Sequence, residues 1–304
     1  MKVAIYWGCE IPTAQYAYEM SIRQVFPHFD IRLVDLKGAS CCGGPVRSIN
    51  TSAAMYLSAR NLALSSQTGI EDLLVPCNEC HFMLSETKYR IDNDEKMREK
   101  IEKLLAEERL TYSSEVKIWH VIDLFHDLVK VDAVKAKVKR RFEGLKFMVH
   151  PGCQIIRPSE IGRVDHAERP IKLDALVEAL GAETLDYSEK LDCCGAALLH
   201  SHKDAALSLA GSKLKAVQSY GVDGFVDSCP YCHMMYDAKQ EEAATTVGGK
   251  LSLSVLYYTQ LLGLALGVDQ EKLGLHLNQS FDPNKLDARA KNILIPRGNL
   301  DDRL

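Results

Sequence analysis

The sequence carries almost no excess charge. Its 37 Lys and Arg residues nearly balance its 41 Asp and Glu residues, which leaves a formal net charge of −4 over 304 residues. It also lacks a Lys/Arg-rich block and any interleaving of aromatic and basic residues, which are the features typical of a nucleic-acid-binding surface. These absences argue against nucleic acid as a partner.

Long apolar runs are absent as well. The N-terminal segment Met1–Cys9 has the pattern of a strand and lacks the long apolar stretch of a signal peptide. The longest apolar run near the end, Leu261–Val268, is far shorter than the roughly 20 residues that a membrane-spanning helix needs. We therefore expect a cytoplasmic protein without direct membrane insertion, in which any membrane association comes through a partner.

Cysteine, by contrast, is abundant, with ten residues in the chain. The cytosol keeps thiols reduced, so cysteines in such a protein are more often metal ligands or redox groups than parts of a disulfide framework. All ten fall into two sets with one pattern: a single cysteine, an adjacent pair, and two cysteines separated by two residues. The first set is Cys9, Cys41, Cys42, Cys77 and Cys80, and the second is Cys153, Cys193, Cys194, Cys229 and Cys232.

The residues around the cysteines repeat too. In both sets 35 positions separate the second cysteine of the pair from the next cysteine. Trp7–Cys9 matches Pro151–Cys153, CCGG matches CCGA, and CNECH matches CPYCH, while the second unit carries extra residues in the loop around Ile156–Arg163. The repeat predicts a duplicated unit. We place the two domains at residues 1–142 and 143–304, the second with a C-terminal extension.

Each unit is expected to alternate strands and helices. We predict strands at Val3–Trp7, Ile31–Leu36, Leu73–Pro76, Lys146–His150, Glu183–Tyr187 and Gly224–Asp227, and helices at Thr13–Phe26, Ala53–Ser65, Leu173–Leu180 and Ala205–Ser219. This alternation indicates an α/β fold in which each unit is a small, mostly parallel sheet flanked by helices. Every cysteine group then lies just beyond the C-terminal end of a strand, where open α/β sheets place ligands. Five thiols should converge on one edge of each sheet.

Three kinds of site are compatible with five cysteines per unit. A zinc site uses four tetrahedral ligands, which leaves one thiolate over. A disulfide set fits poorly with an odd count and a reducing compartment. Iron–sulfur binding fits the count and the preference of iron for soft thiolates, and an adjacent pair suits a polynuclear cluster better than one small ion. The iron–sulfur interpretation is favoured, with zinc and free or bridged thiols as alternatives.

The cysteine pattern, C-x(31–39)-CC-x(34–36)-C-x-x-C given twice, is that of the CCG domain. Over nearly its whole length the chain resembles the B subunit of heterodisulfide reductase, and the resemblance extends through Arg169–Ala196 and Val255–Leu275. It implies two tandem pseudo-repeated CCG domains, each binding one non-cubane 4Fe–4S cluster through the five cysteines of its set. It also implies a complex with an FAD-containing A subunit and a C subunit that carries 4Fe–4S clusters.

The resemblance implies an activity too. In this family a small-molecule disulfide enters between the two clusters, each of which delivers one electron, and the best-known substrate is the heterodisulfide of coenzymes M and B. Here the residue after the first cysteine of the second domain is Gln154, where the methanogen enzyme is expected to have a histidine. The substrate itself is therefore left open. Arg157 and Arg163 are candidates to bind an anionic part of it.

Histidines near the cysteines are candidate proton donors. His81, His150 and His233 each lie close in sequence to a cysteine of a set, where an imidazole can protonate a nascent thiolate near neutral pH. The alternative is a histidine that tunes the potential of a cluster by hydrogen bonding. Two other functions stay open for the whole chain: an electron-transfer iron–sulfur subunit of a flavin-linked oxidoreductase, and a thiol-oxidising homologue in sulfur metabolism.

Overall fold

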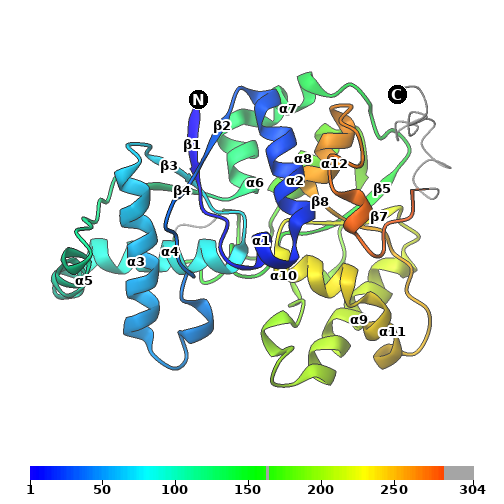
Figure 1. Ribbon diagram of the computed structural model, residues 1–304. Coiled ribbons are helices and arrows are strands. Elements are labelled where there is room, and N and C mark those ends of the chain that lie inside the picture. The colour runs from blue at the N-terminus through cyan, green and yellow to red at the C-terminus, as the bar shows by residue number, and fades with distance from the viewer. Residues whose placement is uncertain (162–163, 284–304) are drawn as a thin grey trace, which may run out of the picture.

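The computed structural model describes residues 1–161 and 164–283. Within them the chain forms two four-stranded sheets of the same topology (Figure 1). The strand order is β2-β1-β3-β4 in the first and β6-β5-β7-β8 in the second, and all neighbouring strands are parallel. The strands are β1 (Lys2–Ile5), β2 (Arg32–Asp35), β3 (Asp72–Leu74), β4 (Lys117–Trp119), β5 (Lys146–His150), β6 (Glu183–Thr184), β7 (Gly224–Asp227) and β8 (Val255–Tyr257).

Helices connect and cover the strands. They are α1 (Glu10–Ala14), α2 (Tyr16–Val25), α3 (Thr51–Gln67), α4 (Asn78–Asn93), α5 (Glu95–Glu107), α6 (Val121–Asp123), α7 (Val131–Lys137), α8 (Lys172–Ala179), α9 (Lys203–Ser219), α10 (Pro230–His233), α11 (Gln240–Val247) and α12 (Tyr258–Ala265). None of those among the described residues is both long and apolar enough to cross a membrane.

The predicted α/β fold with a duplicated sheet is confirmed, but two strands were not predicted. β4 has three residues, too few for an alternating pattern to show, and the apolar β8 runs directly into the apolar helix α12. The helix predicted at Thr13–Phe26 is divided between α1 and α2. Gln15 leaves the helical conformation at that point, and its side chain accepts a hydrogen bond from the hydroxyl of Tyr257.

Most of the hydrophobic core is shared by the two halves. Val3 of β1 and Phe147 of β5, which come from different sheets, belong to the same cluster of buried side chains, and a second, smaller cluster around Phe225 lies in the second half. α12 follows the last strand of the second sheet and packs against α2 of the first half. There the ring of Tyr257 stacks on Tyr18 at 4.1 Å. The division at residues 142 and 143 falls between α7 and β5 and stays a prediction.

If the core is shared, a substitution on α12 should destabilise both halves together. Leu262 on α12 is fully buried, and replacing it with alanine should lower the free energy of unfolding by about 2–5 kcal/mol through lost burial and a residual cavity. The chain has two tryptophans, Trp7 and Trp119, both in the first half. Their fluorescence during urea unfolding should report the loss. An unchanged tryptophan transition would contradict a common core. Leu277→Ala, at a residue 46 % exposed, is the control and should have little effect.

Candidate functional site

The cysteines follow the strand ends as predicted. Cys9 comes after β1 and precedes α1, and Cys77 comes after β3 and caps the N-terminus of α4. Cys229 occupies the same place between β7 and α10. Because parallel strands end at one edge of their sheet, these loops lie together. α1 of the first half and α10 of the second are in contact near the centre of the molecule (Figure 1).

The ten thiols form one continuous series of contacts. Side-chain hydrogen bonds link neighbouring thiols in the order Cys9, Cys41, Cys42, Cys80, Cys77, Cys229, Cys232, Cys194, Cys193 and Cys153. Each set is therefore brought together, and the sets meet where Cys77 contacts Cys229. The sequence predicted convergence within each set, and the family resemblance implied that the two sets face one substrate. The direct contact between Cys77 and Cys229 was not predicted.

Contacts among the thiols shift their pKa values in both directions. Hydrogen bonds with Cys41 and Cys80 lower the pKa of Cys42 to about 5. Hydrogen bonds with Cys153 and Cys194 lower the pKa of Cys193 to about 2. Hydrogen bonds with Cys42 and Cys193 in turn raise the pKa of Cys41 and of Cys153. Each set therefore contains a thiol that readily forms the thiolate, which is the metal-binding form of cysteine.

Glycine is required after each cysteine pair. Gly43 and Gly195 have φ angles of +90° and +83°, and a Cβ there would lie 2.5 Å and 2.6 Å from the carbonyl oxygens of Ala54 and Ala206. In this conformation the N–H of Gly43 donates to Cys41 Sγ and that of Gly195 to Cys193 Sγ, each at 3.4 Å. The turns thus let the backbone pass close to the thiols and direct donors at them.

The three candidate histidines are all buried, each 2 % exposed. The His81 ring meets the edge of His120 at 5.8 Å. Nδ1 of His150 lies 2.8 Å from Nζ of Lys213. The ring of His233 stacks on Tyr257.

Two carboxylates flank His233. Its Nδ1 lies 3.3 Å from Asp227 and its Nε2 lies 3.8 Å from Asp237. Burial alone would lower the pKa of His233, but these carboxylates outweigh it and raise that pKa above its ordinary value.

The candidate substrate residues lie beside the second set. Gln154 is half-buried next to Cys153. Arg157 is exposed, and its Nη2 donates to the carbonyl oxygen of Leu191 at 2.7 Å, just before the second cysteine pair. Arg163 lies outside the described residues.

Sequence reasoning missed two residues between the sets. Tyr231 of the second half forms a side-chain hydrogen bond with Cys9 of the first, and burial raises the pKa of the Tyr231 hydroxyl. Glu79 holds the matching position between the last two cysteines of the first set, and burial, followed by Cys229 and Cys9, raises the pKa of its carboxyl. Both lie between the two cysteines of a C-x-x-C motif, and this position is the one feature of the sequence that could have identified them.

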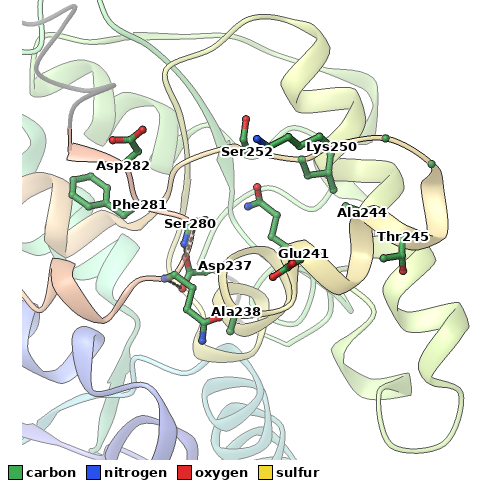
Figure 2. Close-up of a pocket in the computed structure, with 15 residues that line it drawn as sticks. Asp237, Ala238, Glu241, Ala244, Thr245, Lys250, Ser252, Ser280, Phe281 and Asp282 are labelled. Carbon is green, nitrogen blue, oxygen red and sulfur yellow. Dashed lines mark hydrogen bonds between the residues drawn. The ribbon is translucent and has the colours of Figure 1, made fainter.

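A separate cavity of about 1000 Å³ opens beside α11 (Figure 2). It is lined partly by Asp237, which accepts hydrogen bonds from the backbone N–H and hydroxyl of Ser280. None of the ten cysteines lines it.

The cysteine sets do not enclose a single ion. Among residues 1–161 and 164–283, no group of three or more His, Cys, Asp or Glu side chains is arranged to hold one metal ion. The thiols are instead linked pairwise along an extended series.

Comparisons with known proteins identify the family. The CCG family, described as a cysteine-rich domain, matches residues 3–85 and 147–237, which include all ten cysteines. The chain is 32 % identical to the B subunit of the ferredoxin/F(420)H(2)-dependent CoB-CoM heterodisulfide reductase of Methanosarcina acetivorans, over 91 % of this chain and 93 % of that protein. The chain belongs to the family of heterodisulfide reductase B subunits. The resemblance seen in the sequence is confirmed, and each sheet carries one CCG domain.

Two further comparisons extend the likeness of this CCG protein beyond the heterodisulfide reductases. It is 29 % identical to the 8-methylmenaquinol:fumarate reductase membrane anchor subunit of Wolinella succinogenes, over 94 % of this chain and 99 % of that one. A crystal structure of a hypothetical protein from Helicobacter pylori matches with a TM-score of 0.74 at 15 % identity. That match covers 92 % of this chain and 52 % of the other, and it shows the fold alone.

Gly152 of the second CCG domain packs tightly against Asn78 of the first. A Cβ there would lie 1.9 Å from Nδ2 of Asn78, which donates to the carbonyl oxygen of Pro151 at 3.0 Å. Gly152→Ala should therefore lower the free energy of unfolding by more than the about 1–2 kcal/mol of left-handed strain. Gly69→Ala is the matched control, since Gly69 also has a positive φ but no atom within 4 Å of its Cβ position. If urea unfolding shows the same loss of unfolding free energy for Gly152→Ala and Gly69→Ala, Asn78 does not constrain Gly152.

Proposed function

We propose that this chain is the iron–sulfur subunit of a cytoplasmic complex of the heterodisulfide reductase type. In that role it reduces, or reversibly forms, a disulfide such as the coenzyme M–coenzyme B heterodisulfide. The observation that supports this most is the contact between Cys77 and Cys229, because it brings two five-thiol sets to one place. The proposed partners are an FAD-containing A subunit and a C subunit with 4Fe–4S clusters.

The donor sets fit the cofactor. Each set offers five soft thiols, more than the four that zinc takes, and they extend along a series rather than surrounding one point. Cys9, Cys41, Cys42, Cys77 and Cys80 would hold one non-cubane 4Fe–4S cluster, and Cys153, Cys193, Cys194, Cys229 and Cys232 the other. When bound, two such clusters supply single electrons, which together match the two electrons needed to cleave an S–S bond.

The chain's own residues would orient the substrate and supply protons. Gln154 and Arg157 flank the second set at accessible positions. The hydroxyl group of Tyr231 forms a hydrogen bond with Cys9, which is exposed, so it could meet a substrate there. His81, His150 and His233 stay candidates for proton transfer, but their burial requires that a proton reach the substrate through intervening groups.

A second candidate function is electron transfer without a sulfur substrate, as a subunit of a flavin-linked oxidoreductase. The similarity to the fumarate reductase subunit of Wolinella succinogenes favours it. Thiol-dependent spectroscopy separates the two proposals, because a simple electron-transfer subunit has no reason to respond to a thiol.

Metal analysis tests the cofactor. The anaerobically purified chain should contain about eight irons and a matching amount of sulfide. Cys194→Ser removes a ligand of the second set and should reduce the iron to about four per chain. Ser66→Ala, outside both sets, should keep the wild-type content. Zinc in place of iron, or an unchanged iron content in Cys194→Ser, would overturn the assignment.

Electron paramagnetic resonance tests the reaction. Adding coenzyme M or coenzyme B thiol to the oxidised protein should produce a new paramagnetic signal if sulfur binds at the site. Propanol, which lacks the thiol, is the control. No thiol-dependent signal would favour the electron-transfer function.

Arg157 tests the substrate site. With the coenzyme M–coenzyme B heterodisulfide and a reduced viologen dye, Arg157→Gln should raise KM several-fold and leave kcat nearly unchanged, as expected when ground-state binding is lost. Arg157→Lys keeps the charge, and its KM should lie between those of the wild type and Arg157→Gln. An unchanged KM would exclude Arg157 from substrate binding.

A further inference from the structure

The two halves place different residues at equivalent points behind their cysteine pairs. Asn61 stands nineteen residues after Cys42 on α3, and Lys213 stands nineteen residues after Cys194 on α9. Both side chains are removed from water, with Asn61 0 % and Lys213 1 % exposed. The position is polar in both halves but carries a charge only in the second of the two.

In the first half the polar side chain holds the backbone before the pair. Oδ1 of Asn61 accepts a hydrogen bond from the N–H of Ser40 at 2.9 Å. Its Nδ2 donates to the carbonyl oxygens of Ser40 and Cys41 at 3.1 Å and 3.2 Å. A neutral amide is thus sufficient to fix this loop.

Lys213 performs the same task in the second half. Its Nζ donates to the carbonyl oxygens of Lys190 and Asp192 at 3.0 Å each and lies 2.8 Å from His150 Nδ1. Asp192 is the counterpart of Ser40, since each directly precedes a cysteine pair. Both side chains thus donate to the carbonyl oxygen of the residue before the cysteine pair, but only Lys213 brings a charge.

The geometry fits a charged lysine. An ammonium group has three N–H donors, and Nζ of Lys213 has three partners. Burial lowers the pKa of Lys213 to about 8, and the attraction of the Asp192 carboxylate and of the thiolates of Cys232, Cys194 and Cys153 opposes that effect, so the charge is present at neutral pH. The carboxylate of Asp192 is exposed, so water screens it, whereas the buried ammonium is screened far less.

We propose that Lys213 is a positioning residue that makes the redox group held by the second cysteine set the more easily reduced of the two. A buried positive charge stabilises an electron added nearby, and net charge is one of the factors that set the potential of an iron–sulfur site. The first electron to reach the pair of sites would then go to the group held by Cys153, Cys193, Cys194, Cys229 and Cys232. This inference rests on the proposed function, because it requires that both sets hold a redox group.

An anaerobic redox titration of the iron-loaded full chain, followed by electron paramagnetic resonance, tests the inference. Lys213→Asn removes the charge and introduces an amide, which is the group that fixes the equivalent loop at Asn61. It should lower the potential of one component, with about a tenfold change in its oxidised-to-reduced ratio at fixed potential, equal to 59 mV for a one-electron couple. The component whose potential changes should be the one that is absent from the spectrum of Cys194→Ser, and the potential of the other component should be unchanged.

Matched variants separate charge from structure. Lys215→Asn removes the same charge two residues along α9, but at an exposed position, and should shift neither component. Lys213→Arg keeps the charge and should stay near wild type. If Lys213→Asn loses iron, the inference is tested with Asn61→Lys, because the added charge should raise the reduction potential of the other component.

Three results would overturn the inference. They are no shift in a loaded Lys213→Asn protein, equal shifts of both components, and the same shift in Lys215→Asn. A wild-type chain without iron and sulfide would overturn the proposed function as well, so the two failures are distinguishable.

Discussion

The contact between Cys77 and Cys229 is the constraint around which the rest of the site is arranged. Each of these thiols sits at the start of a helix that follows a central strand, and both are buried. For them to touch, the C-terminal edges of two separate sheets have to face each other. Parallel strands make this possible, because they deliver all their loops to the same edge.

The shared core holds those edges in place. Each four-stranded sheet is supported by helices that also contact the other half. α12 is the clearest case, since it follows β8 in the chain but packs on α2. Ser21 on α2 and Thr259 on α12 are joined by a buried hydroxyl hydrogen bond of 2.6 Å. The distance between the two cysteine sets is therefore fixed by packing rather than by a linker.

Duplication gave the protein two similar sites without making them identical. Asn78 spans the junction to Pro151, whereas its counterpart in the second half is Pro230, which has no side chain able to do so. Asn61 and Lys213 hold equivalent loops with different charge. Differences of this kind give two sites with one fold distinct electrostatic surroundings.

The sequence alone determined the cysteine sets, the duplicated α/β architecture, six of the eight described strands and the family. These features are local or repeat at fixed spacing, so they are readable without knowledge of contacts. The tertiary structure decided what lies between them. The meeting of Cys77 with Cys229, the reach of Tyr231 to Cys9 and the burial of Lys213 against His150 join residues that are 63 to 222 positions apart. Side chains so distant in the chain leave no joint pattern in it, because only tertiary packing brings them together: the two sheets for the first two pairs, and α9 on β5 for Lys213 and His150.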